Sequence, residues 1–248
     1  MKDSIILTSN ITYLFDTINN LTTSDEKMIG VYAAPGIGKT KAGEYCQAQL
    51  GAIYYRAFKM SPYGLLYTLL APLMVRPKSM VTGLNTLIEL LKASKYKAII
   101  IDECDTLNDD CLELIRTIHD LAKIPTVLIG EQNLYGKLKQ HDRLFDRTTH
   151  LEFTPLDLSD ARRFVRELCD VKIDQDMIIA IHTYADGNFR RFKQAVKHVE
   201  KTCLLDNVTE VDLETWGKKR SFISDLSHPP SFAKVATRRT PLKTSSVA

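Results

Sequence analysis

The sequence predicts an α/β fold in which a parallel β-sheet carries a phosphate-binding loop and is followed by a small domain of helices alone. Residues 33–40, Ala-Ala-Pro-Gly-Ile-Gly-Lys-Thr, follow a short apolar run and have the glycines and the Lys-Thr end of a loop that binds phosphate. Apolar runs then alternate with segments of helical periodicity, a pattern typical of a parallel sheet with helical crossovers. After Pro155 the strand patterns stop, and the remaining segments have helical patterns only.

Each predicted element follows from apolar spacing and from the residues at its ends. A helical lead-in is expected at 1–27, because Ile11, Leu14 and Ile18 recur at helical spacing. The predicted strands are 28–33, 52–56, 97–102, 125–130 and 150–153, and the helices between them are 39–50, 62–74, 80–94, 108–122 and 133–140. The later helices are 157–169, 174–185, 188–205 and 209–218, with Ser159 and Asp174 as N-caps. We therefore expect an α/β nucleotide-binding domain at 28–154, a helical domain at 155–219 and a tail at 220–248.

Composition excludes several classes of protein. The chain has 248 residues, of which 44% are hydrophobic and 25% charged, as in an ordinary globular protein. It has no run of about 18 apolar residues and no N-terminal signal pattern, so neither a membrane protein nor a secreted one is predicted. The five cysteines lack C-x-x-C spacing, which favours reduced thiols in a cytoplasmic protein and argues against a zinc site.

The C-terminal tail differs in charge from the rest of the chain. Residues 218–248 contain seven basic side chains and one acidic side chain, together with prolines, serines and threonines. This composition predicts a disordered segment. A basic tail can bind nucleic acid or an acidic partner, and the alternative interpretation is a solubilising terminus.

The loop at 33–40 predicts a site for ATP. Backbone N–H groups at the start of a helix form an anion site, in which Lys39 would reach the β- and γ-phosphates and Thr40 would be a ligand of Mg²⁺. Ala33 stands where the loop pattern has its first glycine, but Gly36 and Gly38 still supply the permissive backbone. The residues expected around the phosphates are Pro35, Gly36, Ile37, Gly38, Lys39, Thr40 and Lys41.

A second motif completes the predicted site. Residues 97–103, Lys-Ala-Ile-Ile-Ile-Asp-Glu, form an apolar run ending in two carboxylates, as in a central strand buried on both faces. Asp102 would hold Mg²⁺, and Glu103 would orient and polarise the attacking water. Two acids favour hydrolysis over binding alone, so the sequence predicts a Mg²⁺-dependent ATPase.

These motifs and the domain order resemble the AAA+ ATPase family, with 33–40 as its Walker A motif and 98–103 as its Walker B motif. The resemblance implies a sensor 1 residue after the strand that ends at 130, where the chain offers Glu131 or Gln132. It also implies sensor 2 in Gly187-Asn188-Phe189-Arg190, where Arg190, or alternatively Arg191, would reach the nucleotide.

The resemblance further implies an arginine finger, which acts in the site of a neighbouring subunit. The matching segment is Arg143-Leu144-Phe145-Asp146-Arg147, in which Arg147 is the first choice and Arg143 the second. The alternative interpretation is a surface arginine paired with Asp142 or Asp146.

Within the AAA+ family the chain resembles the transposition regulators, namely the phage Mu B protein, the TnsC-type proteins and, more distantly, the IstB helpers. The resemblance rests on Ile-Ile-Ile-Asp-Glu-Cys-Asp-Thr-Leu (99–107), on Ile-Pro-Thr-Val-Leu-Ile-Gly-Glu-Gln-Asn-Leu (124–134) and on Arg-Leu-Phe-Asp-Arg (143–147). It implies a homo-oligomer, a helical filament or ring, that forms with ATP on double-stranded DNA without sequence preference. Such an assembly would select target DNA, recruit a DDE transposase and disassemble on hydrolysis.

In this group the helices after the second strand contact the DNA, and the matching region is 56–95. Arg76 and Lys78 are the first candidates, because Pro77 makes their turn short and exposed. A solvated loop is the alternative. The region also offers Arg56, Lys59, Ser79 and Thr82, whereas four tyrosines are interpreted as core or subunit-packing residues, namely Tyr54, Tyr55, Tyr63 and Tyr67.

Two other functions share the same predicted site. A helicase loader or replication initiator would differ in its partner, and it usually adds an N-terminal partner-binding domain or a C-terminal DNA-reading domain. We expect neither in this sequence, which favours the transposition regulator. A signalling or defence NTPase that works as a nucleotide switch usually carries a fused sensor or effector domain, and it need not hydrolyse ATP quickly.

Overall fold

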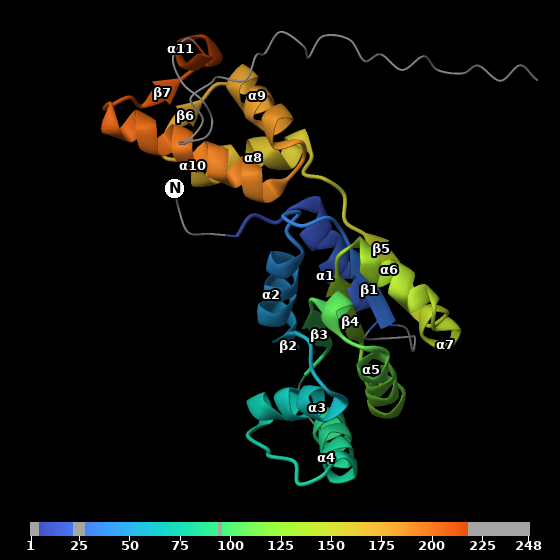
Figure 1. Ribbon diagram of the computed structural model, residues 1–248. Coiled ribbons are helices and arrows are strands. Elements are labelled where there is room, and N and C mark those ends of the chain that lie inside the picture. Colours follow the sequence, from blue (N-terminus) through green and yellow to red (C-terminus); the bar gives the residue numbers. More distant parts are fainter. Residues whose placement is uncertain (1–4, 22–27, 94–95, 218–248) are drawn as a thin grey trace, which may run out of the picture.

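A five-stranded parallel sheet forms the centre of the larger domain (Figure 1). The computed structural model describes residues 5–21, 28–93 and 96–217, so the predicted tail at 220–248 lies outside the described residues. The strands are β1 (Met28–Tyr32), β2 (Ile53–Arg56), β3 (Ile99–Asp102), β4 (Thr126–Gly130) and β5 (Thr148–Glu152), in the order β2-β3-β4-β1-β5. The five predicted strands are confirmed. β5 begins two residues earlier than predicted, because the polar pair Thr148-Thr149 also joins β1.

The sheet brings distant segments to one edge. β1, β3 and β4 are buried at every residue, which is why each strand reads as an apolar run in the sequence. All neighbouring strands are parallel, with β1 between β4 and β5 and β3 between β2 and β4. Because the carboxyl ends of parallel strands lie at the same edge, the segments that follow β1, β3 and β4 meet there.

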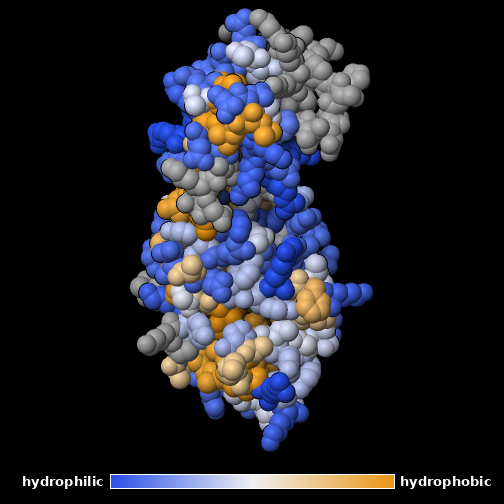
Figure 2. Space-filling view, turned by 90° about the vertical axis from the view of Figure 1, so that its left-hand side faces the viewer, coloured by the Kyte–Doolittle hydropathy of each residue, from blue (hydrophilic) through white to orange (hydrophobic). Residues whose placement is uncertain are grey.

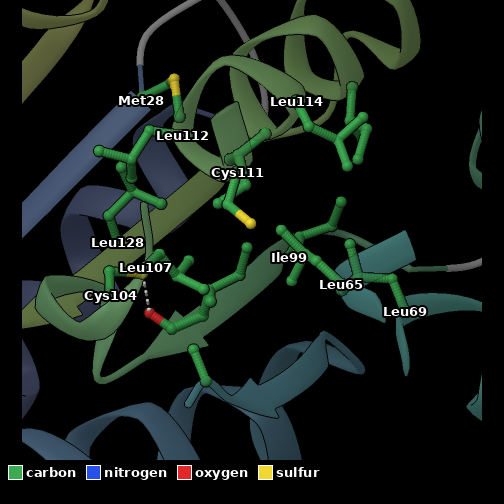
Figure 3. Close-up of a cluster of buried hydrophobic side chains, with 14 of the residues drawn as sticks. Met28, Leu65, Leu69, Ile99, Cys104, Leu107, Cys111, Leu112, Leu114 and Leu128 are labelled. Carbon is green, nitrogen blue, oxygen red and sulfur yellow. Dashed lines mark hydrogen bonds between the residues drawn. The ribbon is translucent and has the colours of Figure 1, made fainter. Parts of the chain in front are cut away.

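Helices cover both faces of the sheet. On one face α1 (Ser9–Leu21) and α2 (Lys39–Leu50) pack against alternate strand residues such as Ile29 and Ile129. The residues between these, such as Met28 and Leu128, point to the opposite face and its larger core, part of which is drawn in Figure 3. The helices that contribute to this core are α3 (Pro62–Leu70), α4 (Met80–Ala93), α5 (Asp109–Ala122), α6 (Gln132–Lys139) and α7 (Asp142–Phe145).

Local chemistry explains where these helices begin and end. α3 begins after Ser61, whose hydroxyl accepts the Gly64 N–H, and α5 begins after Asn108, whose side chain accepts the Cys111 N–H. The helix predicted at 62–74 ends at Leu70 and continues only as a 3₁₀ turn, η1 (Ala71–Leu73), because Met74 adopts a left-handed conformation with φ 59°. α3 and α4 therefore form a hairpin at one end of the molecule (Figure 1).

A second domain with its own core follows β5. Its helices are α8 (Leu158–Leu168), α9 (Gln175–Ala185), α10 (Phe189–Leu205) and α11 (Leu213–Gly217), around a core that includes Phe164 and Phe192. The prediction of helices alone was wrong in one respect, because β6 (Lys172–Ile173) and β7 (Glu210–Val211) form a two-stranded parallel sheet. Strands of two residues are too short to show the alternation that identifies a strand in a sequence.

One helix cap and the position of β7 correct two details of this domain. Asp157, not Ser159, is the N-cap of α8, since its carboxylate accepts the Asp160 N–H at 2.6 Å. Asp174 is the N-cap of α9, as predicted. The helix predicted at 209–218 begins only at Leu213, because β7 occupies Glu210–Val211. In the described part of the chain, no helix is both long enough and apolar enough to cross a membrane.

Candidate nucleotide-binding site

The predicted phosphate-binding loop joins the carboxyl end of β1 to the first residue of α2. Gly36 and Gly38 have φ values of 84° and 107°, a region that glycine enters at little cost. A Cβ on Gly38 would meet nothing within 4 Å, whereas a Cβ on Gly36 would lie 2.6 Å from the Asn188 side chain. The loop therefore has the conformation and the position at a helix N-terminus that suit an anion.

Lys39 lies over this loop among carboxylates. Its ammonium donates to the carbonyl oxygens of Ala33 at 2.6 Å and Ala34 at 3.0 Å. Burial lowers the pKa of Lys39, and the charges of four acids oppose this shift, namely Glu131, Asp102, Glu103 and Asp105. Phosphate oxygens would give the ammonium stronger, charged acceptors than these two carbonyls.

Asp102, at the end of β3, lies beside the loop as predicted. Its side chain is only 1% exposed, and its two oxygens accept three hydrogen bonds. Oδ2 accepts the Thr40 hydroxyl and the Tyr54 hydroxyl, both at 2.8 Å, and Oδ1 accepts the Glu103 N–H at 2.9 Å. Burial, followed by the charge of Asp102, raises the pKa of Tyr54. The Thr40 hydroxyl and the Asp102 carboxylate are hard oxygen donors, the type that Mg²⁺ prefers.

Glu103 follows Asp102 and is held by an ion pair. Its Oε1 accepts from an Arg56 guanidinium nitrogen at 2.8 Å, and this hydrogen bond is the main cause that raises the pKa of Arg56. The backbone of Glu103 is left-handed, with φ 59°. Arg56, at the end of β2, was predicted only as one of several DNA contacts, so the sequence missed its contact with the second acid of the site.

The segment after β4 contributes a third carboxylate. Glu131 is exposed, and its N–H donates to the Asp105 Oδ1 at 3.2 Å. Among the charges that raise the pKa of Lys39, that of Glu131 is the largest. The Gln132 side chain instead donates to Glu152 at the end of β5, at 2.6 Å. Of the two sensor 1 candidates, Glu131 is therefore the one whose charge acts on Lys39.

The helical domain touches the loop through the start of α10. The Asn188 side chain donates to the Pro35 carbonyl at 2.9 Å, and the Arg190 N–H donates to the Gly36 carbonyl at 3.0 Å. Asn188 also caps α10 by accepting the Arg191 N–H. The predicted sensor 2 segment thus lies against the loop, but by the Asn188 side chain and the Arg190 backbone. Both arginine side chains are exposed.

A cavity of about 340 Å³ opens beside the loop. It lies between the segment that leads into α1, the loop and the helical domain, and its walls present both apolar and polar groups. The lining residues include Ile6, Ile11, Ile37, Phe164, Phe189 and Lys41. This cavity was not predicted from the sequence, because its lining comes from four segments that are far apart in the chain.

The predicted finger residues lie away from this site. Arg147 forms an ion pair with Asp120, not with Asp142 or Asp146, and its carbonyl accepts the Met28 N–H at 2.8 Å. It therefore lies at the amino end of β1, with the strand's length of roughly 15 Å between it and the loop. Arg143 is exposed on α7. Neither residue is placed to act on the loop of its own chain.

The predicted DNA-contacting residues lie on the α3–α4 hairpin and the segment before it. Arg76, Lys78 and Lys59 are exposed, whereas the Ser79 hydroxyl is 2.9 Å from the Thr82 hydroxyl, where it caps α4. The Tyr63 hydroxyl donates to the Pro77 carbonyl at 2.8 Å. This hydrogen bond ties the turn that carries Arg76 and Lys78 to α3. Figure 2 shows apolar residues at the surface of this end of the molecule. The exposed apolar side chains of this region are Phe58, Tyr63, Tyr67, Met74 and Val81.

Comparison with known proteins agrees with this geometry. Residues 22–138 match a family model described as an AAA domain. The structure is similar to that of Cdc6p from Pyrobaculum aerophilum, with a TM-score of 0.60 and 14% identity over 81% of this chain and 62% of that one. It is also similar to the Aeropyrum pernix Orc1 protein in complex with DNA, with a TM-score of 0.58 and 16% identity over 85% of this chain and 63% of that one.

A third similar structure is that of the Thermotoga maritima RuvB Holliday junction branch migration motor. Its TM-score is 0.56, at 16% identity over 85% of this chain and 70% of that one. The chain therefore has the same fold as these three structures. The chain spans 62% and 63% of the length of the Cdc6p and Orc1 chains. No curated protein matches the sequence.

The position in the fold of the glycine loop and of the Asp102-Glu103 pair was therefore predicted from the sequence, whereas three contacts of the site were not. These contacts are made by Tyr54, Arg56 and Asn188. Within the described ranges, no group of three histidine, cysteine, aspartate or glutamate side chains is placed to hold a metal.

Proposed function

We propose that the protein is an ATP-hydrolysing AAA+ regulator of DNA transposition that assembles on duplex DNA. The observation that carries the ATPase part is the convergence of Lys39, Thr40, Asp102 and Glu103 around the glycine loop at one edge of the sheet. The loop N–H groups and Lys39 would bind the phosphates of ATP. The adenine would occupy the cavity of about 340 Å³ beside the loop, where Ile37, Phe164 and Phe189 supply apolar surface.

Thr40 and Asp102 would hold Mg²⁺, which supplies positive charge to the phosphate oxygens when bound. Glu103 would take a proton from the attacking water. Its carboxylate is paired with Arg56. To reach a water molecule, the carboxylate must therefore leave this ion pair or use the oxygen that is not bound to Arg56. Glu131 would orient groups near the terminal phosphate, and Arg190 would approach the nucleotide when the helical domain moves.

Arg147 is proposed as the finger that completes the site of a neighbouring subunit. We expect Arg147→Ala to lower DNA-stimulated ATP hydrolysis by at least about a hundredfold, since a finger of this kind contributes about 10³–10⁵ in rate in related NTPases. The affinity of each subunit for ATP should not change, because Arg147 lies at the far end of β1 from its own loop. Phosphate release and nucleotide titration measure the two quantities.

Arg116→Ala is the matched control, because Arg116 pairs with the same carboxylate, Asp120, but lies on α5. It should leave the DNA-stimulated rate within about twofold, since Arg116 pairs with Glu113 and Asp120 of its own helix and is not proposed to enter a neighbouring site. A large loss in Arg143→Ala with none in Arg147→Ala would move the finger to Arg143.

The DNA surface is proposed to be the α3–α4 hairpin. Arg76, Lys78 and Lys59 supply exposed positive charge, and the exposed aromatic and aliphatic side chains around them can contact sugars and bases. The similar Orc1 structure is a complex with DNA, and RuvB is described as a Holliday junction branch migration motor. These relatives support a role on DNA.

Negative-stain microscopy with duplex DNA tests the proposal. We expect filaments or rings that need ATP or a slowly hydrolysed analogue, and we expect Arg76→Ala/Lys78→Ala to prevent them at physiological salt. Loss of two phosphate contacts should also reduce the slope of log affinity against log salt by about 2. Lys197→Ala/Lys201→Ala, which removes two exposed lysines of α10, is the charge-matched control. ATP binding without assembly on DNA would refute the regulator proposal.

A helicase loader or replication initiator is the second candidate, because similarity to Cdc6p and Orc1 favours it. It would use the same nucleotide site. ATP-dependent binding of a helicase, without recruitment of a DDE transposase, would favour this function.

A further inference from the structure

Strand β2 contacts both acids of the nucleotide site. Its residues Tyr54 and Arg56 are two apart, so their side chains leave the same face of the strand. The Tyr54 hydroxyl donates to Asp102 and the Arg56 guanidinium pairs with Glu103, each at 2.8 Å. β2 lies beside β3 in parallel register, with Tyr54 opposite Ile100 and Arg56 opposite Asp102. The edge strand of the sheet thus reaches the two carboxylates at the end of its neighbour.

Packing holds the Tyr54 ring in place. A Cβ on Gly43 of α2 would lie only 2.9 Å from Cε2 of Tyr54, so α2 leaves no free space beside the ring. The hydroxyl at the end of this ring donates to the same oxygen of Asp102 that accepts the Thr40 hydroxyl. Without Tyr54, Oδ2 of this buried carboxylate would keep a single donor.

We propose that Tyr54 is a positioning residue for the divalent cation, fixing the orientation in which the Asp102 carboxylate meets Mg²⁺ beside Thr40. The inference rests on the proposed ATPase function. Tyr54 would touch neither the nucleotide nor the metal, and it would act through Asp102. Residues that orient a metal ligand in this way commonly contribute about 10–100-fold to metal affinity.

The test uses Tyr54→Phe, which keeps the packed ring and removes the donor. The dissociation constant of a fluorescent, slowly hydrolysed ATP analogue is measured in EDTA and in saturating Mg²⁺. The constant in EDTA divided by the constant in Mg²⁺ gives the factor by which the metal strengthens binding. We expect this ratio to fall about tenfold in Tyr54→Phe, with the constant in EDTA within about twofold of the wild-type value. A merely structural role for Tyr54 would change the constant in EDTA instead.

Tyr55→Phe is the matched control. Tyr55 is the next residue of the same strand, on its other face, where its hydroxyl lies 3.8 Å from the Met60 sulfur. It should leave both constants unchanged. An unchanged or larger ratio in Tyr54→Phe, or an equal fall in Tyr55→Phe, would overturn the inference while the ATP site stands. A wild-type chain whose analogue binding does not respond to Mg²⁺ would overturn the proposed function as well.

Discussion

Lys39→Ala is expected to lower the affinity for ATP by about a hundredfold or more, since truncating one partner of a buried charge pair costs about 2–5 kcal/mol. The wild-type ammonium is poised over the loop by two carbonyl oxygens. Its removal would also leave the charges of the acids around it without this cation. Those acids, Glu131, Asp102, Glu103 and Asp105, would then repel the phosphates.

Titration with a fluorescent nucleotide measures this loss, and microscopy on duplex DNA measures its consequence, which is the absence of ATP-dependent assemblies. Lys139→Ala is the control, because Lys139 is an exposed lysine at the end of α6. If Lys39→Ala still formed ATP-stimulated assemblies on DNA, the assignment of the nucleotide site to this loop would be wrong.

Glu103→Gln is expected to lower the rate of ATP hydrolysis by about 10²–10⁴-fold, the usual contribution of a general base. Glutamine has nearly the same shape and can still accept a hydrogen bond from Arg56, but it cannot take a proton from water. ATP affinity should therefore stay within about threefold of the wild-type value, and assemblies on DNA should persist instead of dissolving.

Phosphate release gives the rate of hydrolysis, and the lifetime of DNA-bound assemblies after dilution gives the rate of disassembly. Glu152→Gln is the matched control, because Glu152 is also an acid at the end of a strand, at the same edge of the sheet. Faster disassembly of Glu103→Gln than of the wild type would remove Glu103 from its proposed role.

The sequence predicted the fold well where burial leaves a continuous signal. β3 and β4 are buried at every residue, so their apolar runs stand out against the amphipathic helices between them. β6 and β7 were missed, because two residues cannot show a period. The N-cap of α8 was misplaced by two residues, since Asp157 and Ser159 are both capable of capping a helix.

The candidate site was likewise predicted only in part from the sequence. The loop, Asp102 and Glu103 were predicted because each motif is contiguous in the chain. The contacts of Tyr54 with Asp102 and of Asn188 with Pro35 join residues 48 and 153 positions apart. Such contacts depend on which strands are neighbours and on how the two domains meet. A single sequence does not encode either one locally.

At the position of Glu103, the residue that would be best for stability differs from the residue that the proposed reaction needs. The left-handed backbone of Glu103, with φ 59°, costs an ordinary side chain about 1–2 kcal/mol that glycine avoids. Selection for stability alone would therefore replace this acid by glycine. If Glu103 has the proposed role, we expect related chains that hydrolyse ATP to keep an acid at this position, and related chains that only bind nucleotide to accept a glycine there.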